Sequence, residues 1–367
     1  MVNFQSTMAF NQSNMMFRTD EYRKWFGKIE HDIRRSQIKA VVKVNQGLLR
    51  LYWQMGCEIV EKQRQTRWGD GFLERLSTDL LVEFPKMKGF SLRNLKYIRQ
   101  WYLFYCQDDV IGKQLVSQLS SPAFQQVEEI FFSIPWGHHV MILQRCKEVN
   151  SAWFYIRNTV ENNWSRSTLG WQIDSRLHRR QGKAVNNFAN TLPHIQSDLA
   201  RQMTKDPYVI DLMGVRKEME EREIENYLDT HVSRFLLELG KGFTFYGRQV
   251  QLNIGNESFY VDLLFYHVRL HSYVVVELKA SKFKPEHVGQ LKFYVSAVDQ
   301  QFRSERDNPT IGLLVCKEKN DIVAEYSLRG IETPIGISSM KIYNQLMADF
   351  KSMLPTIEEI EKELGND

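Results

Sequence analysis

The sequence has no apolar run near the roughly 18 residues that a membrane-spanning helix requires. Residues 1–17 also lack the basic and then apolar segments of a secretory leader. The four cysteines (Cys57, Cys106, Cys146 and Cys316) show no C-x-x-C spacing, which disfavours a zinc site and a disulfide framework. We therefore expect a soluble cytoplasmic protein that has no membrane partner.

The chain is long enough for two domains, and its charge is divided unevenly between its halves. Its 367 residues carry a net charge of +4. Residues 1–185 hold 27 Lys and Arg against 17 Asp and Glu, which is +10, whereas residues 186–367 hold 21 against 27, which is −6. The basic half indicates contact with a polyanion such as DNA, and a basic solvated surface without a partner is the alternative.

The first half is typical of an all-helical domain over residues 19–185. Residues 1–18 have little periodicity and are expected to form a flexible tail. Apolar residues three and four positions apart then predict a long helix from about Asp20 to Gln65 and a second helix over 72–84, which Pro85 ends. Further helices are predicted over 92–105, 123–132, 136–149, 152–163 and 168–182.

Residues 72–105 have the pattern of a helix-turn-helix. Ser91 is a good N-cap for the helix over 92–105, which has an apolar face. Its opposite face carries basic, aromatic and amide side chains that would suit a helix in the DNA major groove: Arg93, Lys96, Tyr97 and Gln100. A pair of packed helices without DNA contact is the alternative interpretation.

Two histidines and four aromatic residues in the first half are not assigned a metal-binding or a base-stacking role. His138 and His139 are adjacent on a predicted helix and point about 100° apart, so they favour surface or core positions over joint metal binding. The helical spacing of Trp153, Phe154, Trp164 and Trp171 is more typical of a core than of base stacking.

The second half predicts a linker over 186–210 and an α/β domain over 211–367. A helix from about Glu218 to Leu239 should precede three strands, over 243–254, 258–266 and 273–279, with a Gly255-Asn256 hairpin turn between the first two. A helix over 285–298, a strand over 310–316, a helix over 321–328, a strand over 335–340 and a helix from 342 follow. The expected element order is α-β-β-β-α-β.

Ionic side chains stand in the middle of two of these apolar strands. Asp262 lies in the second strand, and Glu277 and Lys279 lie on one face of the third. The short connection between the strands makes them antiparallel neighbours, so these three side chains can meet at one end of the hairpin. Two converging carboxylates suit a hard divalent cation such as Mg²⁺, and a nearby lysine can orient an attacking water or neutralise developing charge.

Two further groups extend this constellation. Gln290 lies about one turn into the following helix and could hold a water or a phosphate, and Glu225 in the preceding helix could add a carboxylate. Glu221 and Glu223 are alternatives to Glu225 because the sequence does not fix the rotation of that helix. A solvent-exposed cross-strand ion pair between Lys279 and Asp262 is the non-catalytic alternative.

These residues resemble the PD-(D/E)xK nuclease superfamily, and more narrowly its YhcG-like bacterial members. In the second half the similar segments are Phe235-Leu-Leu-Glu-Leu-Gly240, Gly247-Arg-Gln249, Phe259-Tyr-Val-Asp-Leu-Leu-Phe-Tyr-His267, Val276-Glu-Leu-Lys279, Phe283-Lys-Pro285 and Gly289-Gln290. In the first half they are Trp68-Gly, Leu76-Ser-Thr-Asp-Leu80, Phe84-Pro85, Gly89-Phe-Ser-Leu-Arg-Asn-Leu95 and Ile134-Pro-Trp-Gly-His138.

The resemblance implies a winged-helix-like DNA-binding domain followed by a restriction-endonuclease-like domain that hydrolyses phosphodiester bonds with Mg²⁺ or Mn²⁺. It implies that Asp262 and Glu277 are metal ligands, that Lys279 is catalytic and that Gln290 assists. Val261 stands where the superfamily usually has proline, which provides no ligand. The alternatives are a non-catalytic DNA-binding or assembly protein and a nuclease for RNA or branched DNA. A homodimer would supply the two sites that cutting both strands requires, although no motif indicates one.

Overall fold

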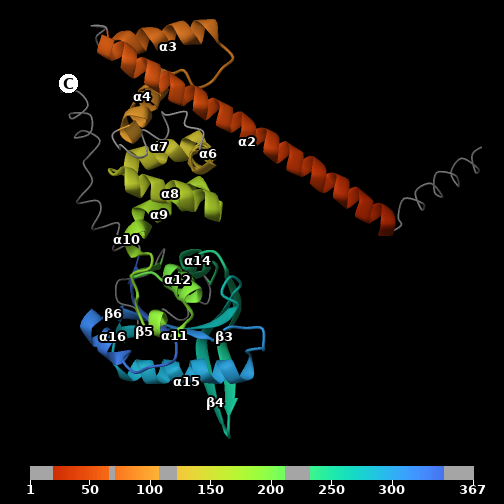
Figure 1. Ribbon diagram of the computed structural model, residues 1–367, viewed down its shortest axis with the longest axis vertical. Helices are drawn as coiled ribbons and strands as arrows, with labels where there is room; N and C mark the ends of the chain where they lie inside the picture. The colour runs from red at the N-terminus through yellow and green to blue at the C-terminus, as the bar shows by residue number, and fades with distance from the viewer. Residues whose placement is uncertain (1–19, 66–70, 107–121, 211–231, 343–367) are drawn as a thin grey trace, which may run out of the picture. The chain divides into compact units, whose positions relative to one another are not determined.

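The computed structural model describes residues 20–65, 71–106, 122–210 and 232–342 (Figure 1). The chain divides into two compact units, residues 1–169 and 170–367, which are considered separately below. No helix among the described residues is long and apolar enough to cross a membrane. The predicted N-terminal tail, the start of the helix over 218–239 and the helix after 342 lie outside the described residues.

The first unit is helical, as the periodicity of the sequence predicts. Its helices are α2 (Asp20–Gln65), α3 (Gly71–Glu83), α4 (Leu92–Cys106), α6 (Pro122–Phe131), α7 (Trp136–Arg145), α8 (Val149–Asn162) and α9 (Arg166–Asp174), and α9 runs on into the second unit. The helix predicted over 168–182 is wrong in its length. It is interrupted after α9 because Arg176 is left-handed (φ 52°), and a short α10 (Leu177–Arg180) follows.

Aromatic side chains build the core of this unit. Trp101 of α4 is fully buried and stacks on Phe131 with their ring centroids 5.2 Å apart. The Trp101 indole donates a hydrogen bond to Nδ1 of His139 (3.2 Å), and Nε2 of His139 lies 2.9 Å from the carbonyl oxygen of Phe131. Burial lowers the pKa of His139 to about 3. His139 is thus a neutral core histidine, as predicted.

The α3–α4 pair has the bounds that the sequence predicts, and a tight connection joins the two helices. Gly89 in this connection has φ 119°, and a Cβ there would lie 2.2 Å from the Tyr52 hydroxyl, so no larger residue fits. Ser77 of α3 donates to the carbonyl of Phe90 (2.8 Å), and the Ser91 hydroxyl accepts from the N–H of Asn94 at the start of α4 (3.4 Å).

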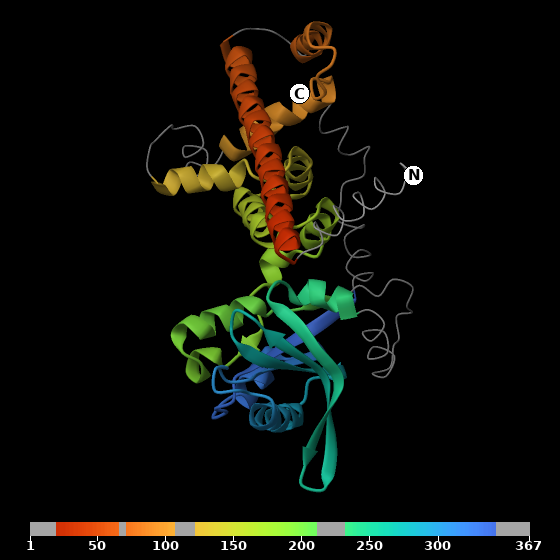
Figure 2. The ribbon, with the colours of Figure 1, turned by 90° about the vertical axis from the view of Figure 1, so that its right-hand side faces the viewer.

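The second unit is built on one mixed sheet with the order β1-β7-β6-β5-β4-β3, and β2 also pairs with β7 (Figures 1 and 2). Strands β3, β4 and β5 are antiparallel, whereas β5, β6 and β7 are parallel. The remaining elements are β1 (Val185–Asn186), α11 (Phe188–Thr191), α12 (His194–Met203), β2 (Tyr208–Ile210), α14 (Val232–Leu239), β3 (Phe243–Ile254), β4 (Glu257–His267), β5 (Ser272–Lys282), α15 (Glu286–Gln301), β6 (Ile311–Glu318), α16 (Asp321–Ser327) and β7 (Ile335–Ile342).

Helices cover both faces of this sheet, so the unit has three layers with two apolar cores. Side chains of α12 and α14 pack on the face that carries Val274, Val276 and Leu278 of β5. Side chains of α15 and α16 pack on the other face, which carries Val275. Because side chains alternate along a strand, β5 presents Glu277 and Lys279 on the α15 face.

The expected linker over 186–210 is instead folded into the second unit. Strands β1 and β2 both pair with β7, and Phe188 is fully buried in the core. The polar residues that suggested a connection make tertiary hydrogen bonds. The Asn187 amide donates to the carbonyls of Ile331 and Thr333, and its oxygen accepts from the N–H of Ile335 (2.8 Å).

A buried charged cluster joins this segment to α14. Glu238 Oε1 lies 2.5 Å from Arg180 Nη1 and also accepts from the N–H of Val209 (2.8 Å). Lys205 lies 4.0 Å from the other oxygen of Glu238, and burial lowers the pKa of Lys205 to about 8. A buried carboxylate between two cations holds α14 on the segment that was expected to be a linker.

Replacing Glu238 with Gln should therefore destabilise the second unit. The change leaves Arg180 and Lys205 buried without their counter-charge, which costs about 3–5 kcal/mol. The same change at exposed Glu257 should leave the free energy of unfolding within about 0.5 kcal/mol of wild type. Equilibrium urea unfolding measures both, and equal stability of the two variants would contradict a structural role for the cluster.

His267 should make the second unit less stable in acid. Burial lowers its pKa to about 4, and its Nδ1 accepts from the N–H of Leu270 (3.1 Å). Since the unfolded imidazole titrates near 6.5, the unfolded state binds the extra proton below that pH. The contribution of neutral His267 to the free energy of unfolding is retained above pH 6.5. The free energy of unfolding should fall by about 2 kcal/mol between pH 7 and pH 5. Urea unfolding of the His267→Asn variant should show a smaller pH dependence than wild type, and an unchanged dependence would exclude His267 as its source.

Candidate active site

The register of the hairpin brings the ionic residues of β4 and β5 to the same place. Leu263 of β4 pairs with Val276 of β5, and Leu264 pairs with Val275. Asp262, the next residue of β4, reaches β5 through its side chain, which accepts a hydrogen bond from the backbone N–H of Leu278, the residue after Glu277. Simple strand alternation would place Val261 and Leu263 on one face, but Val261 packs in the core on the α15 side and Leu263 packs in the opposite core.

Glu277 is the buried centre of the group. Its side chain is 2% exposed, and its Oε1 accepts hydrogen bonds from Lys279 Nζ (3.0 Å) and Gln290 Nε2 (3.1 Å). The Lys279 side chain is 16% exposed, so it reaches from the buried carboxylate to the surface. An ammonium and an amide therefore converge on one carboxylate oxygen, and both hydrogen bonds fix the orientation of Glu277.

Asp262 is fixed by two different donors. Its Oδ2 accepts from the backbone N–H of Leu278 (2.9 Å), the residue between Glu277 and Lys279. Its Oδ1 accepts from the side-chain amide of Gln249 on β3 (3.2 Å). Gln249 has the left-handed φ of 42°, just after a register shift between Phe245 and Gly247. This irregularity of β3 directs an amide at Asp262.

Helix α15 supplies the third side of the site. Gln290 lies in its second turn and its amide also donates to the Tyr294 hydroxyl (3.1 Å), one helical turn further on. A Cβ on the neighbouring Gly289 would meet nothing within 4 Å, so the helix surface beside Gln290 is open. A ligand can approach the group from this side.

The structure thus brings together four of the five predicted catalytic residues: Asp262, Glu277, Lys279 and Gln290. Glu225 and the alternatives Glu221 and Glu223 lie outside the described residues. Sequence reasoning gave no role to Gln249 and did not single out Tyr294. The i, i+4 spacing of Tyr294 from Gln290 on a helix is the signal that could have found it.

The donor set fits Mg²⁺ or Mn²⁺ better than zinc. Asp262 and Glu277 offer carboxylate oxygens, which hard divalent cations prefer. No group of three or more His, Cys, Asp or Glu side chains with metal-binding geometry occurs among the described residues. Two carboxylates leave coordination positions for water and a phosphate oxygen, whereas structural zinc needs a closed set of four ligands.

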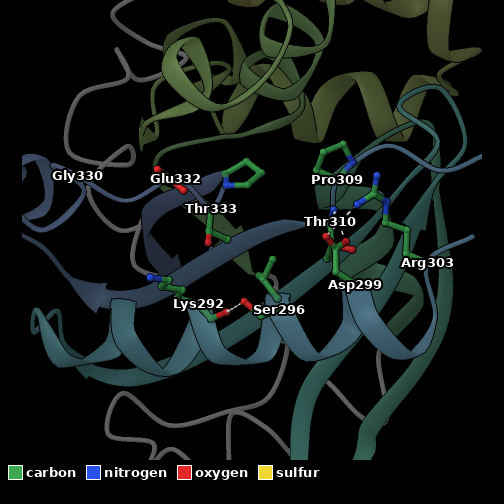
Figure 3. Close-up of a pocket in the computed structure, with 11 residues that line it drawn as sticks. Lys292, Ser296, Asp299, Arg303, Pro309, Thr310, Gly330, Glu332 and Thr333 are labelled. Atoms are coloured by element: carbon green, nitrogen blue, oxygen red, sulfur yellow. Dashed lines mark hydrogen bonds and ion pairs between the residues drawn. The ribbon is translucent and has the colours of Figure 1, made fainter. Parts of the chain in front are cut away.

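A polar cavity in this unit is separate from the candidate site (Figure 3). It has a volume of about 320 Å³ and lies between α15 and the segments that enter β6 and β7. Asp299 accepts from the N–H of Thr310 (2.9 Å) and pairs with Arg303 (3.2 Å) on its wall. None of the four clustered residues lines it.

The predicted DNA-contacting face of α4 is on the surface of the first unit. Arg93, Lys96 and Gln100 are exposed, and Tyr97 is half-buried. The Arg93 guanidinium donates to the Tyr97 hydroxyl (3.4 Å), and Gln144 of α7 donates to the same hydroxyl. The opposite face buries Leu95, Ile98, Trp101 and Tyr105.

The fold and the site define a nuclease domain of the PD-(D/E)xK type. Residues 201–355 match the family described as the YhcG PDDEXK nuclease domain, and residues 28–180 match the DUF1016 N-terminal domain. The two matches together give a helical N-terminal domain followed by a nuclease domain of the restriction-endonuclease-like fold. The resemblance in the sequence is confirmed.

One known protein is similar to nearly the whole chain, and two solved structures are similar to about a third of it. It is 29% identical over 367 residues to the Escherichia coli (strain K12) protein called "Putative nuclease YhcG", covering 94% of both chains. A repair endonuclease from Pyrococcus abyssi is 21% identical over 35% of this chain and 49% of its own, with a TM-score of 0.24. The EndoMS–dsDNA complex is 20% identical over 36% and 48%, with a TM-score of 0.25. This chain spans about half the length of those two solved structures.

Proposed function

We propose that this protein is a Mg²⁺-dependent DNA endonuclease of the cytoplasm. The observation that carries the proposal is the convergence of Lys279 and Gln290 on the buried Glu277, beside an Asp262 that is hydrogen-bonded to the same strand. The match of residues 201–355 to a nuclease domain supports the hydrolytic activity. The four free cysteines are compatible with a reducing compartment.

Each residue of the site has a task in phosphodiester hydrolysis. Asp262 and Glu277 would hold the metal ion, which when bound would activate a water and polarise the phosphate. The Lys279 ammonium, partly exposed beside Glu277, neutralises negative charge that develops on the phosphate oxygens. Gln290 and Gln249 keep the two carboxylates oriented, since each donates an amide N–H to one of them.

The helical unit would bind the duplex. Its half of the chain carries a charge of +10, from 27 basic and 17 acidic residues in 1–185, and α4 exposes Arg93, Lys96 and Gln100 on one face. Lys and Arg side chains neutralise phosphates, and an exposed helix can enter the major groove. The alternatives of a non-catalytic protein and of an RNA nuclease have no specific observation in their favour.

Lys279→Ala should abolish cleavage while DNA binding is retained. Loss of a charge that stabilises the transition state lowers the rate by on the order of 10²–10³-fold. Lys282→Ala is the matched control, because Lys282 lies on the same strand and is exposed. Cleavage of duplex, single-stranded and branched DNA and of RNA, with Mg²⁺ and with EDTA, measures both activity and substrate. A Lys279→Ala protein that cuts like wild type would disprove the assigned site.

The double substitution Arg93→Ala with Lys96→Ala should weaken DNA binding at every sequence. If each residue contacts one phosphate, the slope of log affinity against log salt should decrease by about 2. Lys147→Ala, an exposed basic residue between α7 and α8, should change the affinity less. Fluorescence anisotropy at several salt concentrations gives the slope, and an unchanged slope would place the DNA-binding surface elsewhere.

A further inference from the structure

The outer half of the β3–β4 hairpin extends past the rest of the sheet. The pairing of β4 with β5 begins at Leu263, whereas residues 257–261 of β4 pair with β3. Figure 2 shows this two-stranded part, in teal, projecting beyond the neighbouring strands. We call residues 250–261 the outer ribbon. It begins beside Asp262 on the same strand and leads away from the candidate site.

One face of the outer ribbon is apolar and packs on α15. Leu252 is fully buried in the core on that side, and Phe259 lies against Phe293 of α15 with their ring centroids 4.8 Å apart. The side-chain amide of Gln301, at the end of α15, donates to the carbonyl of Asn253 (3.1 Å). A two-stranded hairpin alone is marginally stable in water, so this packing supports the ribbon and fixes the direction of its other face.

The other face is polar and ordered. Gln251 pairs with Tyr260 and Asn253 pairs with Ser258, so the alternation of side chains puts all four on one face. The Gln251 amide donates to Oδ1 of Asn253 (2.9 Å) and to the Ser258 hydroxyl (3.0 Å), and this hydroxyl donates to the same Oδ1 (3.0 Å). All four residues are exposed, and none of them is charged.

The chemistry of this face suits base edges in a duplex. A face without Lys or Arg does not neutralise phosphates, and its one tyrosine is too few for the stacking of successive bases that holds a single strand. Both N–H groups of the Gln251 amide are used within the face, which leaves its oxygen as an acceptor and the Asn253 amide nitrogen as a donor. Adenine presents the matching donor and acceptor in the major groove, which admits a two-stranded ribbon.

The position of the face relative to the candidate site sets which bases it meets. Ser258 precedes Asp262 by four residues of a strand, about 14 Å at about 3.4 Å per residue, and a DNA strand advances by about 3.4 Å per nucleotide. Resting on the nuclease function proposed above, we propose that the outer ribbon lies in the major groove of the duplex substrate. Gln251 and Asn253 then make the enzyme prefer an adenine within about four base pairs, on one side of the cut.

Sequencing the ends cut from a random-sequence duplex with Mg²⁺ tests the preference. Wild-type ends should be enriched in adenine at one such position. Gln251→Ala with Asn253→Ala should lower the enrichment by about tenfold, the discrimination that one bidentate amide contact provides. Gln300→Ala, which removes an exposed amide from α15, is the matched control and should keep the wild-type pattern. Wild-type ends without enrichment, or a double variant with the wild-type pattern, would overturn the proposal.

A binding selection separates this inference from the catalytic one. Duplexes selected from the same random library by wild-type protein in EDTA, where no cleavage is needed, should carry the same adenine, and those selected by the double variant should not. This difference in the absence of any Mg²⁺-dependent cutting would contradict the nuclease function and support the ribbon contact. Cutting without base preference, together with a selection that shows none, would overturn the ribbon contact alone. Enrichment on single-stranded DNA and none on duplex would overturn the placement in a groove.

Discussion

The candidate site depends on the burial of one carboxylate, that of Glu277, within the central sheet of the second unit. A charged group at 2% exposure is costly unless it is compensated, and here two donors reach the same oxygen. One donor comes from the same strand and the other from α15, which crosses from β5 to the parallel β6. Helix α15 must therefore pack against β5 for Gln290 to reach the Glu277 carboxylate. The same packing forms both the fold and the site.

The first unit is organised differently, around aromatic packing. Trp101 and its neighbours fix α4 from its buried side, and this leaves Arg93, Lys96 and Gln100 on the outside. His139 contributes as a hydrogen-bonded core residue whose pKa is lowered to about 3, so it stays neutral. The rigid aromatic core provides the platform, and the charges that would meet DNA lie on its surface.

Much of this arrangement could be predicted from the sequence where local patterns are strong. The alternation of β3 to β5 and the Gly255-Asn256 turn predicted the hairpins, and their antiparallel arrangement predicted that Asp262 and Glu277 lie on neighbouring strands. The segment over 186–210 was misjudged because its asparagines make hydrogen bonds to residues about 145 positions away. Such partners leave no local signal.

Other features depend on backbone conformation or burial that composition does not encode. Gln249 reaches Asp262 through a left-handed φ beside a register shift, and a strand pattern alone gives no such turn. In the sequence, Glu238 is a charged residue on an amphipathic helix. In the structure it is buried between Arg180 and Lys205, which belong to a segment about 30 to 60 residues earlier in the chain. In both cases the tertiary structure decides what the side chain does.

The central claim is that Asp262 and Glu277 hold a divalent metal ion. A crystal grown with Mn²⁺ and measured at the manganese absorption edge tests it most directly. The account predicts an anomalous peak about 2.0–2.3 Å from a carboxylate oxygen of each residue, the distance that these hard cations adopt. A peak elsewhere in the unit, or none at these two side chains at saturating Mn²⁺, would contradict it.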